Sequence, residues 1–192
     1  MANSSKKRVY WDACAWIALI QDENVWVANE NGEEQRGKMC AEVLRDAEKG
    51  NVEIVTSALS LAEVCKSKAI RRQGYEQRIR DFFENSYIIV VNVDTYIGTE
   101  ARELMQNGRT GLKPADAIHL ASARVANVDE AHTFDDKLLG MSETINRRDG
   151  RGLRIKKPHS EKAKAPLLDY AADQIGADDA DIADSETSND NG

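Results

Sequence analysis

Apolar residues occur along this chain in two patterns that alternate with each other. Short segments rich in apolar, aromatic or β-branched residues at 8–11, 52–56 and 130–134 are typical of strands, and the continuous apolar run at 87–91 is typical of a strand buried on both faces. Segments with apolar residues at helical spacing separate these runs, and a last run at 153–155 predicts an edge strand. This alternation favours an α/β fold of three layers, in which a central, mostly parallel sheet of about four or five strands has helices on both faces.

Helices are expected at 13–21, 38–49, 57–69, 75–84, 94–105 and 115–127. Several of their ends carry the residues that helix ends favour: Ser57 and Asp94 at N-caps, Pro114 in a first turn and Gly50 after a last turn. The polar segment 22–37 shows neither pattern, and we expect a loop or a frayed helix end there.

Charge is distributed unevenly along the chain. The net charge is −7, but eight acidic and no basic residues follow from Asp169 onward, which leaves 25 acidic and 26 basic residues in 1–168. Nucleic acid is therefore not excluded as a partner of the near-neutral body. We predict one domain at 8–157 and an acidic extension at 158–192, which could form a short amphipathic helix at 162–174 and is disordered from about 174. This extension is either an inert solubiliser or a segment that folds back on basic residues and competes with RNA.

Three cysteines, Cys14, Cys40 and Cys65, lie far apart and form no C-x-x-C pair, which is neither a disulfide framework nor a zinc site. Cys14 and Cys65 have apolar neighbours, so we expect them to be small buried residues in a reducing compartment. No apolar run approaches the ~20 residues that span a bilayer, and the basic N-terminus has no signal-peptide core behind it. A cytoplasmic protein that does not bind membranes is expected.

Four separated carboxylates have individual structural explanations. Asp12 and Asp135 follow strands and could cap the next helix or turn. Glu63 matches a capping box with Ser60, although Ser57 is the better N-cap, and Asp116 lies in a first helical turn, where acids suit the macrodipole.

Together, the same carboxylates point to chemistry. Ligands of parallel sheets bind at the carboxyl ends of the strands, where Asp12, Asp135 and the beginning of the Glu63 helix are expected. Carboxylates that converge there would repel one another unless divalent cations compensate their charge. A set of oxygen ligands with few histidines favours Mg²⁺ or Mn²⁺ over zinc, and such ions support in-line phosphoryl displacement.

Four motifs in order resemble the PIN-domain family, and most closely its VapC-type toxins: VYWDACAWIALI, TSALSLAEV, KPADAIHLASA and HTFDDKLL. The resemblance spans roughly residues 8–156. It implies a PIN-like fold and a metal-dependent endoribonuclease that leaves 5′-phosphate and 3′-hydroxyl ends. It also implies Asp12, Glu63, Asp116 and Asp135 as catalytic ligands of Mg²⁺ or Mn²⁺. A hydroxyl near the site is implied too, with Thr133 and Ser57 as candidates.

The resemblance also implies partners. A toxin of a type II toxin–antitoxin pair would cut RNA, bind a small antitoxin and form a homodimer, whereas a free-standing RNA-processing enzyme would have the same motifs. The sequence departs from the family pattern at Asp136, which leaves the fourth ligand ambiguous although the T-x-D register favours Asp135. The insertion at 22–37 and the acidic extension also depart from it, and they weaken the toxin assignment more than the nuclease assignment.

Three other classes of protein fit the sequence less well than a nuclease does. A phosphatase of the haloacid dehalogenase type needs a second Asp where this chain has Cys14, and a response-regulator receiver needs an acidic pair before its phospho-acceptor. A non-catalytic PIN-like module that binds RNA or a protein remains the alternative, although all four motif positions carry acids.

Some remaining polar and aromatic residues have mainly structural explanations. His119, one turn after Asp116 on the same helix face, is expected to pack in its helix and satisfy a backbone carbonyl, with a role near the metals as the alternative. Trp11, Trp16 and Trp26 are expected to anchor the core or loops, with base stacking as the alternative. Two runs of basic residues either form solvated surface or contact the phosphates of an RNA backbone. They are Lys66, Lys68, Arg71, Arg72, Arg78 and Arg80, and Arg147, Arg148, Arg151, Arg154, Lys156 and Lys157.

Overall fold

The computed structural model describes residues 6–27, 32–67, 70, 76–106 and 111–160 of the chain. They belong to one compact unit, residues 1–160. The expected helix at 162–174 and the expected disorder after it lie outside the described residues. None of the described helices is both long and apolar enough to cross a membrane.

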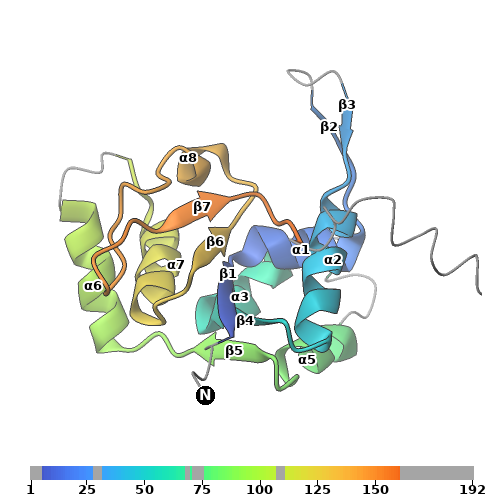
Figure 1. The fold of residues 1–192 in the computed structure, drawn as a ribbon, viewed down its shortest axis with the longest axis horizontal. Coiled ribbons are helices and arrows are strands. Elements are labelled where there is room, and N and C mark those ends of the chain that lie inside the picture. The colour runs from blue at the N-terminus through green and yellow to red at the C-terminus, as the bar shows by residue number, and fades with distance from the viewer. Residues whose placement is uncertain (1–5, 28–31, 68–69, 71–75, 107–110, 161–192) are drawn as a thin grey trace, which may run out of the picture. The chain divides into compact units, whose positions relative to one another are not determined.

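A five-stranded parallel sheet forms the centre of this unit, with strand order β5-β4-β1-β6-β7 (Figure 1). Its strands are β1 (Lys7–Trp11), β4 (Val52–Ser57), β5 (Ile88–Val91), β6 (Glu130–His132) and β7 (Arg154–Lys156). The expected three-layer α/β fold is therefore confirmed. All five strands were expected, but β6 ends two residues earlier than predicted.

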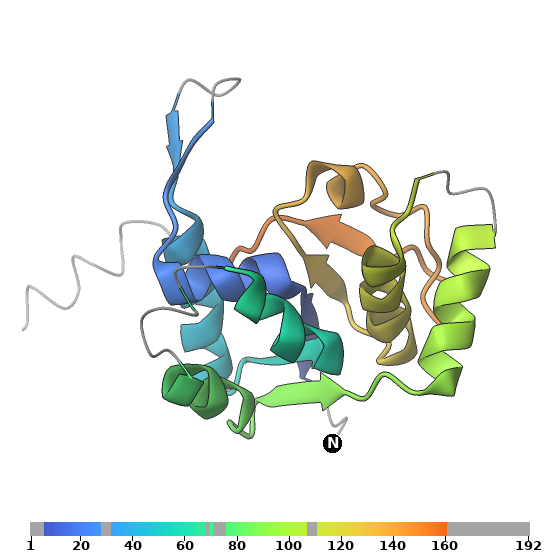
Figure 2. The same ribbon diagram turned by 180° about the vertical axis from the view of Figure 1, so that it is seen from behind.

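Helices cover both faces of the sheet (Figures 1 and 2). They are α1 (Ala13–Gln21), α2 (Arg36–Glu48), α3 (Ala58–Glu63), α5 (Glu76–Phe83), α6 (Thr95–Gln106), α7 (Pro114–Val125) and α8 (Asp136–Leu139). Because side chains alternate along a strand, Val9 and Trp11 pack against α1 and α2, whereas Tyr10 packs against α6 and α7. Two apolar cores result, one on each face.

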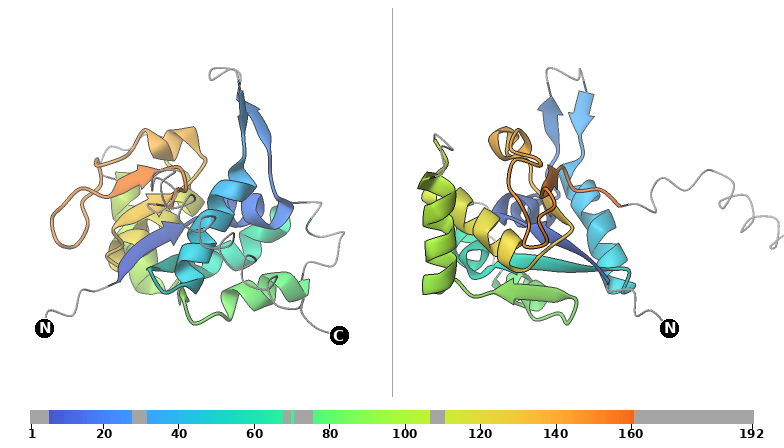
Figure 3. Two further views of the ribbon diagram at one scale, coloured as in Figure 1. Left: turned by 45° about the vertical axis from the view of Figure 1, so that its right-hand side comes forward. Right: turned by 60° about the vertical axis from the view of Figure 1, so that its left-hand side comes forward.

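The segment 22–37 differs from the expected loop. It contains a two-stranded antiparallel hairpin of β2 (Val25–Val27) and β3 (Gly32–Glu34), which extends away from the five-stranded sheet (Figure 3). Each strand has only three residues, too few to show alternation within a polar segment. Trp26 is 64% exposed on β2, so it anchors neither the core nor a loop, in contrast to Trp11 and Trp16, which are fully buried.

Two further expectations need correction. The helix predicted at 57–69 is α3 followed by one 3-10 turn, η1 (Val64–Lys66), and α8 was not predicted because four residues carry little periodicity. Cys40 is buried, but Cys14 and Cys65 are exposed, because their neighbours Ala13, Ala15 and Val64 are the residues that these helical segments bury. All three cysteines are free thiols.

Candidate metal centre and active site

Asp12 directly follows β1 and uses its two carboxylate oxygens in different ways. Oδ1 accepts a hydrogen bond from the backbone N–H of Ala15 at 3.1 Å, which makes Asp12 the N-cap of α1. Oδ2 accepts a hydrogen bond from the hydroxyl of Thr133 at 2.5 Å. Asp12 therefore caps a helix, as its structural explanation proposed, and also contacts a residue 121 positions away that follows β6.

Glu63 is the last residue of α3, and its side chain is only 9% exposed. Its Oε2 lies 2.6 Å from Nε2 of His119, and its Oε1 is bonded to the ammonium of Lys66. Nδ1 of His119 lies 2.7 Å from the Tyr10 hydroxyl. The expectation that His119 satisfies a backbone carbonyl was wrong, because both ring nitrogens face side chains that only the packing of α3, α7 and β1 brings together.

Asp116 and Asp135 are half-buried at the beginnings of two helices. Asp116 lies in the first turn of α7, which has Pro114 at its start. Asp135 caps α8, since its Oδ1 accepts the backbone N–H groups of Lys137 and Leu138 at 2.9 and 3.3 Å.

The four carboxylates line one pocket of about 160 Å³ at the carboxyl ends of β1, β4 and β6. Its lining residues are Asp12, Ala13, Cys14, Ile17, Glu63, Lys66, Asp116, His119, Asp135 and Leu138. They come from α1, α3, η1, α7 and α8, so the pocket exists only in the assembled fold.

The three supporting candidates lie in different positions. Thr133 is buried beside the pocket, where its hydroxyl donates to Asp12 and accepts the backbone N–H of Asp135 at 3.0 Å. Ser57 is also buried, but its hydroxyl caps α3 by accepting the N–H of Leu59 at 3.2 Å. Asp136 is exposed and is not among the residues that line the pocket, which favours Asp135 as the fourth carboxylate.

Acidic side chains dominate the lining of the pocket. Cys14 is exposed as a residue, but its thiol is partly desolvated in the pocket lining, and this desolvation, followed by the charges of Asp12, Asp135 and Glu63, raises its pKa to about 12. Burial also raises the pKa of Asp12, although the hydrogen bond from Thr133 and the nearby His119 partly oppose this. The pKa of Glu63 is lowered to about 2, chiefly by the hydrogen bond from His119.

The donor set fits Mg²⁺ or Mn²⁺. Four carboxylates face only one lysine and one histidine within the lining, and both ions prefer oxygen ligands. Within the part of the chain that the structure describes, no three of these carboxylates bring oxygens within 4.8 Å of one another. This spread suits an ion such as Mg²⁺, which keeps several waters and takes only one or two carboxylates directly.

A second group of metal-ligand types lies elsewhere, on β6 and the segment after β7. Ligand atoms of Glu130, His132 and His159 lie within 4.8 Å of one another. However, Glu130 already forms ion pairs with Lys7 at 3.1 Å and with Lys156 at 2.8 Å. Nδ1 of His132 is buried without a partner, so a metal on Nε2 would leave a buried N–H donor unpaired. We interpret this group as a buried ion-pair centre.

The described cations of the two basic runs mostly have anionic partners. Lys66 bonds Glu63, and Arg80 is exposed. In the second run, acidic side chains engage five of the six cations: Arg147 and Arg151 pair with Asp149, Arg154 and Lys156 with Glu130, and Lys157 with Glu34. Arg148 stacks on Tyr96 instead. This pairing favours the structural explanation of the second run. Lys68, Arg71 and Arg72, and the side chain of Arg78, lie outside the described residues.

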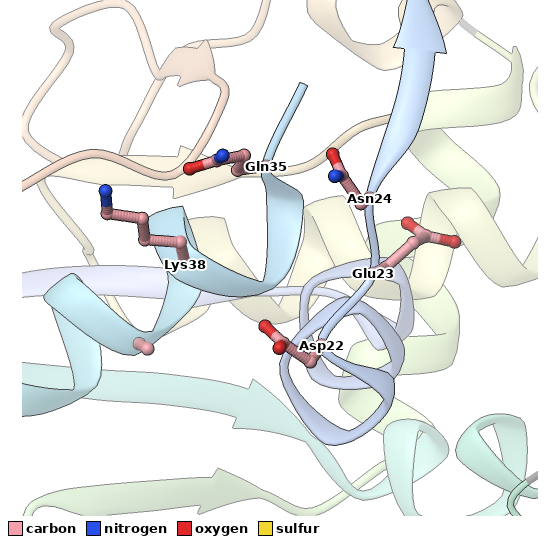
Figure 4. Close-up of a pocket in the computed structure, with 6 residues that line it drawn as sticks. Asp22, Glu23, Asn24, Gln35 and Lys38 are labelled. Atoms are coloured by element: carbon pink, nitrogen blue, oxygen red, sulfur yellow. The ribbon is translucent and has the colours of Figure 1, made fainter. Parts of the chain in front are cut away.

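A larger hollow of about 450 Å³ lies at the base of the hairpin (Figure 4). Its lining combines the end of α1 with the beginning of α2: Asp22, Glu23, Asn24, Gln35, Lys38 and Ala41. It shares no lining residue with the carboxylate pocket and has no comparable set of acids.

Sequence reasoning missed the contacts of Tyr10 and Lys66 with the site, and it gave a role of His119 near the metals only as the less favoured alternative. The spacing of His119, one turn after Asp116, was the only signal available for any of them. In the sequence, Tyr10 cannot be distinguished from an ordinary buried strand residue, because the partner of its hydroxyl is 109 positions away.

Comparisons with known proteins agree with this architecture. The family model described as "PIN domain" matches residues 9–143. No curated protein matches the chain significantly. Solved structures with a similar fold include FitAcB from Neisseria gonorrhoeae, at 14% identity and a TM-score of 0.50 over 78% of this chain and 97% of that one.

Two further similar structures are described as a toxin and as a toxin–antitoxin complex. The Mycobacterium tuberculosis VapC20, described as a sarcin–ricin-loop-cleaving toxin, is 20% identical with a TM-score of 0.47 over 66% of this chain and 89% of that one. A toxin–antitoxin complex from Klebsiella pneumoniae is 22% identical with a TM-score of 0.49 over 67% and 88%. Since the family model covers more than half of the 192 residues and the sheet has the matching α/β architecture, the chain belongs to the PIN domain family.

Proposed function

We propose that this PIN domain is a metal-dependent endoribonuclease that hydrolyses RNA phosphodiester bonds. Asp12, Glu63, Asp116 and Asp135 would hold Mg²⁺ or Mn²⁺. One observation carries the proposal: four carboxylates spread over more than a hundred positions of the chain line a single pocket at the carboxyl ends of the strands. This arrangement costs electrostatic repulsion, which divalent cations would relieve.

The residues of the chain have distinct roles in this proposal. A bound divalent cation would offset phosphate charge and make water a better nucleophile for in-line attack at phosphorus. Thr133 fixes the orientation of Asp12 through its hydroxyl. Asp116 and Asp135 are more exposed than Asp12 and Glu63, so one of them is suited to orient the attacking water. The expected products carry 5′-phosphate and 3′-hydroxyl ends, without a covalent enzyme intermediate.

The biological role that we propose is that of a toxin in a type II toxin–antitoxin pair. Its motifs resemble VapC-type toxins, and toxin–antitoxin complexes are among the solved structures with a similar fold. A small antitoxin that covers the acidic pocket and a homodimer are the partners expected in that case. Growth arrest of a bacterial host on induction of the wild-type chain, but not of Asp12→Asn, would support this role. Normal growth in both cases would favour a free-standing RNA-processing enzyme.

End-labelled RNA is the direct test of the nuclease activity. The wild-type chain should cleave it with Mn²⁺ or Mg²⁺ and not with EDTA, and Asp12→Asn and Asp116→Asn should each lose the activity. Activity that survives both substitutions would place the chemistry elsewhere. A chain that binds no Mn²⁺ and cleaves nothing would instead be a non-catalytic PIN-like module that binds RNA or a protein.

The neighbouring aspartates provide a matched pair of variants for the fourth ligand. Asp135→Asn should lose cleavage, because Asp135 lines the pocket, whereas Asp136→Asn should keep it, because Asp136 is exposed outside the lining. The reverse result would contradict our assignment of the fourth carboxylate.

A further inference from the structure

The two carboxylate oxygens of Glu63 bond to one buried and one exposed side chain. Oε2 is bonded to His119, whose side chain is 6% exposed, and Oε1 is bonded to Lys66, whose side chain is 69% exposed. One oxygen therefore has a partner within the packed interior, and the other has a partner that water reaches freely.

The buried partner belongs to a chain of three side chains. Oε2 of Glu63 lies 2.6 Å from Nε2 of His119, and a carboxylate oxygen can only accept a hydrogen bond from that nitrogen. Nε2 of His119 must therefore carry the hydrogen that lies between them, and in a neutral imidazole Nδ1 is then an acceptor. The Tyr10 hydroxyl lies 2.7 Å from Nδ1 and donates its hydrogen to that nitrogen.

This chain is anchored in the rigid centre of the sheet. Tyr10 lies on β1, which pairs with β4 on one side and β6 on the other, and it is 2% exposed. Its ring meets the His119 ring edge to face, with centroids 6.0 Å apart. The sheet therefore determines the orientation of the imidazole, and the imidazole determines where Glu63 Oε2 lies.

The Lys66 contact is of a different kind. Lys66 lies three residues after Glu63, in the single 3-10 turn η1, and lines the same pocket. An ion pair with one exposed partner contributes little to stability, because water and salt screen it. A divalent cation in the pocket would compete with the ammonium for the same oxygen.

We propose that Tyr10 and His119 are positioning residues that hold Glu63 through Oε2, so that Oε1 is the oxygen offered to the metal, and that Lys66 is the partner which the metal replaces. This rests on the proposed function for the identity of the pocket as a metal site. It assigns roles to three residues outside the set of four carboxylates. Metal-site carboxylates commonly need such outer partners, and their loss typically costs about 10–100-fold in metal affinity.

Mn²⁺ binding, measured directly by electron paramagnetic resonance or calorimetry without RNA, is the test. His119→Ala should weaken Mn²⁺ binding about ten-fold or more. His119→Gln should recover part of that loss, because its amide can still donate to Glu63. Tyr10→Phe should weaken binding a few-fold, because it acts only through His119. Lys66→Met should strengthen binding, by at most about five-fold for so exposed an ion pair.

Tyr87→Phe and His132→Asn, which alter a tyrosine and a buried histidine outside the pocket, are the matched controls and should bind Mn²⁺ as the wild type does. If His119→Ala does not fold, as judged by circular dichroism, Tyr10→Phe and His119→Gln decide the question. Wild-type affinity in the Tyr10 and His119 variants would overturn the positioning role, and unchanged or weaker affinity in Lys66→Met would overturn the replacement. Because binding is measured apart from cleavage, a chain that binds Mn²⁺ without cutting RNA would contradict only the proposed function.

Discussion

Thr133 and Asp12 are joined by a 2.5 Å hydrogen bond between the ends of two adjacent strands, across 121 positions of the chain. The same hydroxyl accepts the backbone N–H of Asp135 at 3.0 Å. One buried threonine therefore ties together two of the four carboxylates that line the pocket.

Thr133→Val should lower both stability and metal affinity. Valine has nearly the same shape but leaves an oxygen of Asp12 and the N–H of Asp135 without a partner, which costs about 1–3 kcal/mol of unfolding free energy. Urea unfolding and Mn²⁺ titration are the measurements. Thr133→Ser retains the hydroxyl and should stay close to the wild type in both. Equal stability of the valine and serine variants would show that this hydrogen bond contributes nothing.

Glu63→Gln should make the free energy of unfolding fall less steeply as the pH is lowered from 4.5 towards 2. The pKa of Glu63 is about 2 in the folded chain and near 4.5 when unperturbed, with the hydrogen bond from His119 as the main cause. Its ionised form therefore contributes stability above pH 4.5, and this contribution disappears as the pH falls from 4.5 towards 2. Chemical unfolding at several pH values in this range measures the slope of the unfolding free energy against pH. Glu103→Gln, on an exposed position of α6, is the control, and an identical slope in both variants would contradict the shift.

Glu130→Gln should destabilise the fold without changing Mn²⁺ or Zn²⁺ binding. Burial alone would raise the pKa of Glu130, but hydrogen bonds from His132, Lys156 and Lys7 outweigh it and lower the pKa. Removing this charge leaves its cationic partners uncompensated, at a cost of about 1–3 kcal/mol, because those partners can still reach water. Thermal unfolding and metal titration measure the two effects. Loss of a bound Zn²⁺ in the variant would instead identify Glu130, His132 and His159 as a metal site.

Gly37→Ala should destabilise the junction between α1 and the hairpin. A Cβ on Gly37 would lie 2.6 Å from the backbone of Asp22, so one of the two segments must shift, at about 1–3 kcal/mol. Gly98→Ala is the matched substitution, since a Cβ there meets nothing within 4 Å on the exposed side of α6. It should stabilise the chain by about 0.5–1 kcal/mol. Thermal unfolding of both variants tests the prediction, and equal effects would contradict it.

The sequence alone determined the layered α/β architecture and its main elements. Buried strands are rich in apolar, aromatic and β-branched residues and lack the helical spacing of the segments between them, so 8–11, 52–56 and 87–91 were recognisable without any tertiary information. It failed where an element was too short to show a period, as in the hairpin 25–34 and in α8.

For the candidate site too, the sequence revealed one part and the tertiary structure the rest. The residue types and their motifs singled out Asp12, Glu63, Asp116 and Asp135, because the four motifs occur in order and carboxylates that converge at strand ends would repel one another without a cation. Only the tertiary structure decided what surrounds them, including the pairing of Tyr10 with His119 and of Thr133 with Asp12. Each of these pairs joins residues more than a hundred positions apart, and a hydrogen bond depends on distance in space, which strand order and register determine.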